Sequence, residues 1–504
     1  MKKLNQRKMV QHRSKLELKN CIESFIYEKI PEDGGEILTL SSRRLLTWNR
    51  LDLAFKLVYL ELRKTLPELA KSIYLEDIKA QTLGQFSEFG NADKNSFEAY
   101  VECFEKIFTS IENDGFLGDK SIVPLGRNGT IYNGAHRIAC SIYLNRRVTA
   151  IQIDLPPMIC DYKYFYDRNV PVNFIEMAVN KFIEYSSDVY IAFLWPSGKK
   201  RISESEILFS NILYKKEVGL SKKGAFNLLA CLYEDMDWVG SKNDGYPGIN
   251  NKLIECFPTF DPVKVIAFQA ENIGKVREIK KNIRLINNIG YSSVHITDNI
   301  REALKISNLL FNDNGLHFLN NSTPHQYVSL DDDLKRFDIL VNEAGIKRSK
   351  LIIDGGAALS VYGIRKNSDI DFLLDGKVPA EFREAGFEPH DDQIIFHKRN
   401  KLELIYSPEN HFIYFGFKFI SFDQLYRMKK YRNEKKDEND CKLMESLCEN
   451  KKYMKLLAKV NQKILYKRLK LHNFIVIFIV EILKKLKLYS AVRKAYHHVM
   501  FLLK

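Results

Sequence analysis

One stretch constrains this chain more than any other: LIIDGGAALSVYGIRKNSDIDFLL, residues 351–374. It begins with an apolar run that predicts a short strand, and the pair Gly355-Gly356 then interrupts that strand. Adjacent glycines let a backbone turn sharply and let an anion approach main-chain N–H groups, which also point outward at a helix N-terminus. Residues 357–362 predict the helix, and Gly363 predicts its end. The pattern therefore predicts a strand, a phosphate-binding turn and a helix.

Two acidic residues follow this helix. Asp369 and Asp371 belong to a segment, residues 369–374, that predicts a strand. Because strand side chains alternate, we expect both carboxylates on one face, with Ile370 and Phe372 in the core. Paired carboxylates repel one another unless a cation neutralises them. Mg2+ typically takes one or two carboxylates plus substrate phosphate oxygens, so the pattern predicts a site for Mg2+ or Mn2+.

The order Gly-Gly, twelve residues, Asp-Ile-Asp resembles the active-site signature of the DNA polymerase beta-like nucleotidyltransferase superfamily. The resemblance covers about residues 330–448. It implies a mixed sheet with helices, a nucleoside triphosphate substrate, and catalysis by metals held on Asp369 and Asp371. It also implies a third carboxylate on a later strand, for which Glu403 in the segment KLELI is the best candidate. The alternative is a glycine turn followed by a solvated acidic strand.

Further phosphate contacts are expected around this signature. Gly355, Gly356 and Ser368 would position the triphosphate, and Arg365 would neutralise charge. The segment after the predicted core, FKFISFDQLYRMKKYRNEKKDENDCKLM, resembles the helical part of small members of the superfamily. Its candidate phosphate or structural contacts are Lys429, Arg432, Lys435 and Asp437.

A second informative stretch lies at residues 121–153, where the predicted order is strand, Asn-Gly turn, strand, helix, strand. Its step Gly134-Ala135-His136-Arg137 resembles the ParB and sulfiredoxin-like fold, whose members bind nucleotide phosphates at the start of a helix. Gly134 permits close approach, and Arg137 adds a bidentate phosphate donor to the helix N-terminal amides. Sulfiredoxins carry a reactive cysteine where this chain has Ala135, so sulfinic acid repair is not expected. The alternative is that His136 and Arg137 cap and brace the sheet.

Residues 188–320 alternate predicted strands and helices, which favours an α/β domain. DVYIAFLW and VKVIAF predict buried strands, and a basic amphipathic helix is expected at residues 271–290. The last predicted strand ends at Asp298, which is the expected N-cap of the next helix. The candidate chemical residues of this region are Lys275, Arg277, Lys281, Arg284, His295 and Asp298.

The basic character of the chain is confined to one end. Of the formal net charge of +14, residues 451–504 contribute fourteen Lys and Arg against one acid, Glu481, or +13. The other 450 residues are therefore near neutral, and a nucleic-acid groove is the less favoured partner. In this tail an apolar run, residues 474–483, is too short for a membrane span of about twenty residues. An amphipathic helix lying on an anionic membrane surface is expected, with RNA binding or a partner helix as alternatives.

The sequence thus predicts a multidomain protein of α/β and α+β class. The expected parts are a helical N-terminal region (1–90), a ParB-like domain (91–160), an α/β domain (161–325), a nucleotidyltransferase-like domain (326–450) and a basic amphipathic tail (451–504). The eight cysteines form no CxxC pair, and no secretory signal precedes them. A cytoplasmic location, peripheral to the inner face of the cell membrane, is therefore expected.

The predicted function is Mg2+-dependent transfer of a nucleotidyl group to a small sugar or alcohol phosphate. The segments GFLGDKSIVPL and NGAHRIA, followed by the predicted α/β domain, resemble proteins encoded beside bacterial capsule and lipopolysaccharide enzymes. This resemblance implies a role in surface polysaccharide synthesis. Two alternatives stay open. One is a kinase or a glycosyl or phosphosugar transferase centred on the N-terminal and central domains. The other is a nucleotide-sensing or toxin-antitoxin type protein with a degenerate transferase domain.

Overall fold

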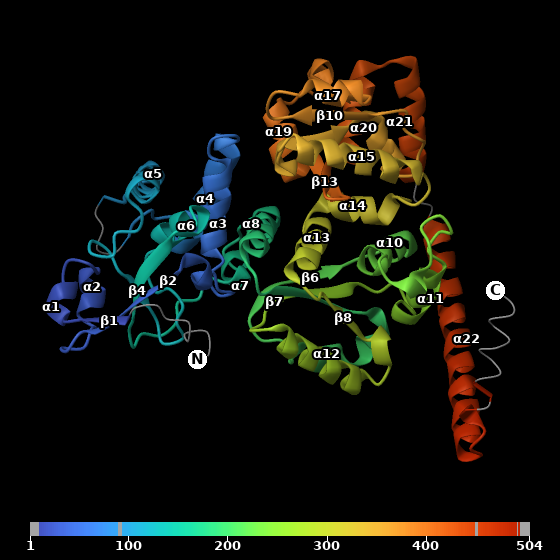
Figure 1. The fold of residues 1–504 in the computed structure, drawn as a ribbon, viewed down its shortest axis with the longest axis horizontal. Helices are drawn as coiled ribbons and strands as arrows, with labels where there is room; N and C mark the ends of the chain where they lie inside the picture. The colour runs from blue at the N-terminus through green and yellow to red at the C-terminus, as the bar shows by residue number, and fades with distance from the viewer. Residues whose placement is uncertain (1–9, 89–92, 449–451, 491, 494–504) are drawn as a thin grey trace.

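The computed structural model describes residues 10–88, 93–448, 452–490 and 492–493, which form helices and three sheets (Figure 1). The fold is therefore of mixed helix-and-strand class, as expected. One buried apolar cluster extends from Leu45 to Met444 and includes residues of all three sheets. The seven cysteines whose side chains are described are free thiols.

The first sheet has the order β1-β2-β4-β3. Its strands are β1 (Val10–Arg13), β2 (Gly35–Ser41), β3 (Val123–Leu125) and β4 (Arg147–Gln152). The helices of this part are α1 (Lys15–Leu18), α2 (Ser24–Tyr27), α3 (Asp52–Leu62), α4 (Pro67–Thr82), α5 (Phe97–Asp114) and α6 (Ala135–Tyr143).

The expectation that residues 1–90 are a helical region was incomplete. β2 pairs with β4 over a sequence separation of more than a hundred residues, through Leu38 opposite Ala150. Such a pairing leaves no local signal in a segment as short as residues 35–41. The strand expected after the Asn-Gly turn is reduced to a single bridge between Leu125 and Ile131. The predicted helices at residues 45–111 are confirmed as α3, α4 and α5.

The second sheet has the order β6-β7-β5-β8, and every pair in it is antiparallel. The strands are β5 (Val189–Leu194), β6 (Ile212–Val218), β7 (Val263–Gln269) and β8 (Val294–Ile296). The helices around them are α7 (Tyr162–Tyr166), α8 (Val172–Tyr185), α9 (Ile202–Glu206), α10 (Lys222–Tyr233), α11 (Pro247–Cys256), α12 (Ile273–Asn287), α13 (Ile300–Leu310) and α14 (Asp313–Asn321).

The burial of β5 explains why the sequence of this strand is a continuous apolar run. Ile191 and Phe193 belong to the large cluster, whereas Ala192 and Leu194 belong to a second cluster beneath α12. A strand buried on both faces needs apolar residues at every position. The expected N-cap of α13 is displaced by one residue, because the side chain of Asn299, not that of Asp298, accepts from the Glu302 N–H.

The third sheet has the order β11-β10-β9-β13-β12. Its strands are β9 (Leu351–Asp354), β10 (Ile370–Leu374), β11 (Phe387–Pro389), β12 (His411–Tyr414) and β13 (Phe417–Ile420). Its helices are α15 (Ser329–Glu343), α16 (Gly355–Val361), α17 (Ala380–Glu384), α18 (Ile394–His397), α19 (Lys401–Tyr406), α20 (Phe422–Arg432) and α21 (Lys435–Cys448). The predicted strand, turn, helix and strand of residues 351–374 are confirmed, with Ile370 and Phe372 buried.

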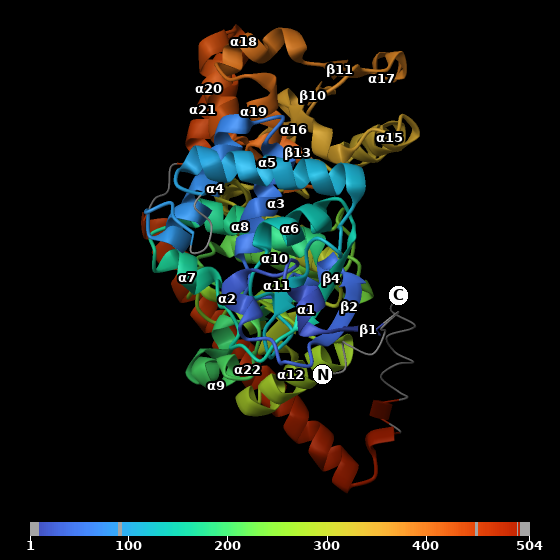
Figure 2. The same cartoon turned by 90° about the vertical axis from the view of Figure 1, so that its left-hand side faces the viewer.

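The tail is the long helix α22 (Lys452–Lys485), which contacts α11 and then extends beyond the rest of the chain (Figures 1 and 2). Residues 474–479 are all apolar and between 42% and 68% exposed. Successive helical residues are about 100° apart, so six in a row surround the helix. The expected one-sided apolar face is therefore wrong for this segment. Residues 451, 491 and 494–504 of the predicted tail lie outside the described residues.

Within the described residues, none of the helices combines the length and the apolarity needed to cross a bilayer.

Candidate functional site

The glycine pair and the two aspartates of the signature line one pocket of about 470 Å³ in the C-terminal sheet. β9 leads into the glycines at the start of α16, and β10 runs antiparallel beside it with Asp371 opposite Asp354. The opposite wall comes from α20 and α21. The pocket is lined by Gly355, Gly356, Arg365, Ser368, Asp369, Asp371, His390, Lys429, Arg432, Lys436, Asn439 and Asp440. Eight of the residues named from the sequence are therefore neighbours in space.

Gly355 is required by the backbone at this turn. Its φ is +62°, and a Cβ at this position would lie 2.2 Å from Asp371 Oδ2. The absence of a side chain thus lets the aspartate lie against the start of α16. At Gly356 a Cβ would have ordinary contacts, the nearest being Arg365 Nη1 at 3.5 Å. The two glycines therefore have different roles.

We expect Gly355→Ala to lower the free energy of unfolding by at least about 2 kcal/mol. The left-handed backbone alone costs an alanine about 1–2 kcal/mol, and the overlap with Asp371 adds to this. Gly356→Ala is the matched control and should change stability by less than about 1 kcal/mol. Urea unfolding of both variants measures the difference. Equal midpoints for the two variants would contradict this account of the turn.

The two aspartates have different environments. Asp369 is exposed and accepts a hydrogen bond from Ser368 Oγ at 3.0 Å. Asp371 is half-buried, and burial raises its pKa to about 6, with the charges of Asp369 and Asp354 adding to the rise. Neighbouring carboxylates of this kind are stabilised in ionised form by a bound cation. The donor set therefore fits a Mg2+ ion that completes its shell with phosphate oxygens and water.

Among the described residues, no group of three or more acidic, histidine or cysteine side chains is arranged to hold a metal ion. Glu403 in particular does not supply the expected third carboxylate. It lies on helix α19 rather than on a strand, and it does not line the pocket. The segment KLELI is too short to distinguish the helical spacing of apolar residues from the alternation of a strand. The pattern Asn400-x-x-Glu403 is a helix-start signal that favours the helix, and Asn400 Oδ1 does accept from the Glu403 N–H at 2.8 Å.

Three basic residues of the pocket, Arg365, Lys429 and Arg432, are held by two buried aspartates. Arg365 forms two hydrogen bonds to Asp440, at 2.7 and 3.0 Å. Lys429 contacts Asp440 at 2.8 Å and Asp437 at 3.1 Å, and Arg432 binds Asp437 through two nitrogens at 2.8 Å. Three cations against two carboxylates leave one net positive charge. Burial opposes ionisation of Asp437, yet Arg432 and Lys429 lower its pKa to about 2.

This network favours the structural one of the two roles expected for Lys429. The side chain is only 2% exposed and is bound by two carboxylates, so it forms the floor of the pocket. Arg365 and Arg432 are more accessible. Lys435 is exposed and lies outside the pocket lining, whereas its neighbour Lys436 is part of it.

A buried aspartate and two histidines form a part of the site that the sequence did not predict. Asp354 Oδ2 accepts hydrogen bonds from His390 Nδ1 and His397 Nε2, both at 2.9 Å. Burial opposes the charge, but the two histidines hold the pKa of Asp354 well below its usual value. Of the two, His390 lines the pocket. It reaches the site from the loop after β11, and no spacing in the sequence indicates this.

The second predicted phosphate site, at Gly134, has a different character. His136 Nε2 lies 2.7 Å from the hydroxyl of Tyr74, and the ring packs against Phe104. Burial lowers the pKa of His136 well below 6.5, so it is neutral near pH 7. Arg137 donates to Glu23 and to Ser121. Gly134 has a φ of +94° and lies against the Arg137 guanidinium. These contacts match the bracing role rather than an open phosphate site.

The central sheet carries a separate pocket of about 570 Å³. It brings together three of the six residues suggested by the sequence, Arg284, His295 and Asp298. The others, Lys275, Arg277 and Lys281, are exposed and do not line it. His295 lies between the Tyr233 hydroxyl and Glu302, each at 3.0 Å. The remaining lining includes Trp238, Tyr291, Lys252 and Lys280.

No protein-family model matches this chain, and comparisons with the curated proteins and with the solved structures found no match either. The chemistry of the chain is therefore inferred from its own side chains.

Proposed function

We propose that this chain is a Mg2+-dependent nucleotidyltransferase that acts on a small hydroxyl or phosphate acceptor. One observation carries the proposal. Gly355, Gly356, Arg365, Ser368, Asp369, Asp371 and Lys429, chosen from the sequence as metal or phosphate ligands, line a single pocket. Its volume of about 470 Å³ is within the usual range for small-molecule sites.

In the proposed reaction an acceptor oxygen attacks the α-phosphorus of a nucleoside triphosphate. The bond from the α-phosphorus to the bridging oxygen breaks, and pyrophosphate leaves. Main-chain N–H groups at the start of α16 and the side chain of Arg365 would bind the phosphates. Asp369 and Asp371 would hold Mg2+, which when bound supplies charge stabilisation to the phosphoryl oxygens.

His390 is the proposed proton acceptor. Asp354 occupies Nδ1, which leaves Nε2 to take the proton of the acceptor hydroxyl. A base oriented by a carboxylate is a common arrangement for activating an oxygen nucleophile. This assignment is supported by the position of His390 in the pocket lining together with both aspartates.

A small acceptor is favoured over a nucleic-acid template by the charge distribution. Nearly all of the excess positive charge lies in residues 451–504, and the network around Lys429 has only one net positive charge. Strong non-specific binding of nucleic acid depends on many phosphate contacts by cations. A sugar, a sugar phosphate or an alcohol phosphate destined for a surface polysaccharide is the proposed acceptor class.

The test is Mg2+-dependent release of pyrophosphate. Full-length protein is incubated with each of the common nucleoside triphosphates and a panel of sugars, sugar phosphates and alcohol phosphates. One nucleotide with one acceptor class should release pyrophosphate, and chelation of the metal should stop it. Binding of the Mg2+-nucleotide without turnover across the panel would favour the nucleotide-sensing alternative.

We further propose that α22 lies on an anionic membrane surface. The apolar segment 474–479 is flanked by exposed cations, with Lys467 and Arg468 before it and Lys484, Lys485 and Lys487 after it. An apolar segment beside lysines and arginines binds the interface of anionic bilayers, and each cation near the surface contributes about 1 kcal/mol.

The double substitution Phe474→Glu with Phe478→Glu should weaken binding to phosphatidylglycerol-containing vesicles by about 100-fold. Burial of two aromatic side chains contributes about 3 kcal/mol, and this is lost. The matched control is Leu16→Glu with Ile207→Glu, two apolar residues elsewhere on the protein that are more exposed than Phe474 and Phe478. Vesicle flotation measures both variants. Undiminished flotation of the α22 variant would refute the membrane role.

A second candidate function is supported by the central pocket. Aromatic rings of Tyr233, Trp238 and Tyr291 beside Arg284 and His295 suit a phosphorylated sugar. A phosphosugar transferase or kinase centred there would not depend on Asp369 and Asp371. Activity that survives loss of both aspartates but is abolished by Arg284→Met would favour this candidate.

A further inference from the structure

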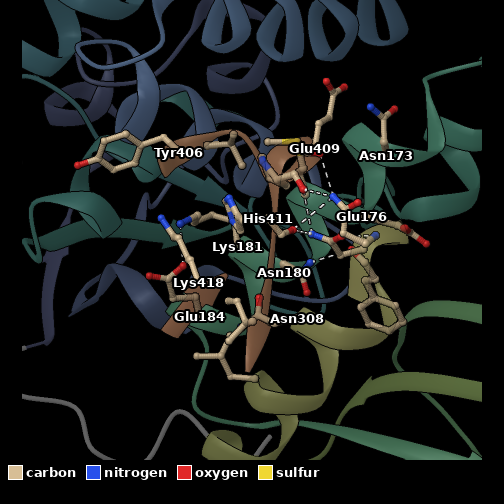
Figure 3. Close-up of a pocket in the computed structure, with 18 of the residues that line it drawn as sticks. Asn173, Glu176, Asn180, Lys181, Glu184, Asn308, Tyr406, Glu409, His411 and Lys418 are labelled. Atoms are coloured by element: carbon tan, nitrogen blue, oxygen red, sulfur yellow. Dashed lines mark hydrogen bonds and ion pairs between the residues drawn. The ribbon is translucent and has the colours of Figure 1, made fainter. Parts of the chain in front are cut away.

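A third cavity, of about 580 Å³, lies where the C-terminal sheet meets helices from the earlier parts of the chain (Figure 3). Its lining combines α3, α8 and α13 with β12, β13 and the residues that flank α19. It is separate from the glycine and aspartate pocket, with which it shares no lining residue.

Most of the charged side chains in this cavity already have partners. Lys181 binds Glu184 at 2.7 Å and also contacts Glu61. Lys216 binds Glu176 at 2.6 Å, and the Tyr214 hydroxyl donates to the same carboxylate. These pairs bring α3, α8 and β6 together. They therefore account for the walls of the cavity and leave few groups for a ligand.

Two buried acceptor atoms in the cavity lining have no partner. His411 is 5% exposed, and its Nδ1 accepts no hydrogen bond, while its other ring nitrogen bonds the backbone of Leu404. Asn180 donates from Nδ2 to the Phe311 carbonyl at 3.1 Å, but its Oδ1 is also unpartnered. Burial lowers the pKa of His411 well below 6.5, so its ring is neutral. Unpaired buried acceptors cost free energy unless a donor reaches them.

One cation in the lining has no carboxylate partner among the described residues. Lys418 Nζ donates to the carbonyls of Ser349 and Ile405, at 2.8 and 2.7 Å. An ammonium group has three N–H donors, so one remains. Burial lowers the pKa of Lys418 to about 8, and the charge of Lys181 adds to this fall, although Glu61 and Glu184 oppose it. Figure 3 places Lys418, His411 and Asn180 around the same space.

We propose that this cavity binds a small polyhydroxylated anion, a sugar phosphate or a sugar acid, whose hydroxyls donate to Asn180 and His411 and whose acidic group pairs with Lys418. The side-chain amides of Asn173 and Asn308 also line the space and suit further hydroxyls. Lys418 immediately precedes Phe419, which is the residue of β13 that pairs with Ile353 of β9. The bound molecule would thus lie next to the strand that leads to Gly355.

The test is calorimetric titration of the full-length protein with glucose 1-phosphate and with glucuronate. At least one of them should bind with a sub-millimolar Kd and raise the Tm. Glucose and inorganic phosphate are the comparison arms, because each lacks one half of the proposed ligand. Each should bind at least about tenfold more weakly than the better probe.

Variants locate the binding. Lys418→Met and Asn180→Ala should each weaken the better probe by at least about tenfold. Lys275→Met is the matched control, since Lys275 is exposed on α12 and should leave the Kd unchanged. If Lys418→Met or Asn180→Ala lowers the Tm, the Kd of the better probe is also measured for Asn173→Ala and Asn308→Ala, two substitutions at the cavity wall. Absence of binding at millimolar concentrations, or a Kd insensitive to Lys418 and Asn180, would mean that water alone fills the cavity and would overturn the proposal.

Binding of the probe in this cavity does not depend on the proposed transferase activity. The variant Asp369→Asn with Asp371→Asn should bind the probe as the wild type does. Loss of binding in that variant would place the probe in the glycine and aspartate pocket and would overturn the assignment of this cavity.

Discussion

Replacing Asp369 and Asp371 together with asparagine is expected to reduce pyrophosphate release by at least about 1,000-fold. The two carboxylates are the proposed Mg2+ ligands, and a bound metal supplies several kcal/mol of charge stabilisation. About 4 kcal/mol corresponds to three factors of ten in rate. Asparagine keeps the size of each side chain and removes its charge. The measurement is the initial rate of pyrophosphate release at saturating Mg2+ and nucleotide.

Glu403→Gln is the matched control for this experiment. Glu403 is the carboxylate that the family resemblance favoured, yet it lies on α19 outside the pocket. Its variant should keep the wild-type rate within about twofold. A rate that falls with Glu403→Gln but not with the double aspartate variant would contradict the proposed site.

The second large effect is expected on the free energy of unfolding, when Asp52 is substituted. Arg50, Asp52, Lys56 and Asp77 form a cluster between α3 and α4 in which none of the four side chains is more than 3% exposed. Asp52 accepts two hydrogen bonds from Arg50 at 2.8 Å and lies 3.7 Å from Lys56. Asp52→Asn removes the charge opposite a buried guanidinium. Breaking one partner of a buried ion pair costs about 3–5 kcal/mol, which urea unfolding should show.

Asp77→Asn is expected to cost less than Asp52→Asn. Burial raises the pKa of Asp77 to about 6, whereas the charges of Arg50 and Lys56 keep that of Asp52 low despite its burial. The folded state therefore binds a proton at Asp77 more tightly than the unfolded state does. Stability from this group is greatest at low pH and is lost as the pH rises from about 4 through 6. The cost of Asp77→Asn should accordingly be smaller at pH 7 than at pH 5. Equal costs for the two variants would contradict this assignment.

The parts of the candidate site that are formed by residues close together in the sequence could be predicted. Gly355 and Asp371 are sixteen positions apart, and one turn, one helix and one strand fix their relation. The register that places Asp371 opposite Asp354 follows from this hairpin-like return. Apolar residues at helical spacing also identified α3, α5 and α12. α3 and α5 pack against neighbouring helices, and α12 packs against β8.

Non-local pairing explains what the sequence did not reveal. β2 finds its partner β4 more than a hundred residues away, so the expected boundary at residue 90 passed through a sheet. His390 enters the pocket through a hydrogen bond to Asp354, a contact between residues thirty-six positions apart. Glu403 was wrongly assigned to a strand because the five residues KLELI fit both a helical and a strand pattern. Asn400 carried the signal for a helix start.

The motif at Gly134 shows a different limit of prediction from the sequence. Gly-Ala-His-Arg has the residue types of a phosphate site, and the helix begins where expected. What decides its role is the surroundings: Tyr74 and Phe104 enclose His136, and Glu23 binds Arg137. These partners come from the N-cap of α2 and from α4 and α5, so the motif alone does not specify them.

The most direct measurement follows which phosphorus atom reaches the acceptor. Full-length protein is given the active nucleoside triphosphate labelled either at the α-phosphate or at the γ-phosphate, together with Mg2+ and the acceptor. Nucleotidyl transfer predicts α-label on the acceptor, γ-label in pyrophosphate, and neither product with Asp369→Asn and Asp371→Asn. Transfer of γ-label to the acceptor, undiminished in the double variant, would show a kinase acting elsewhere in the chain and would contradict the proposed function.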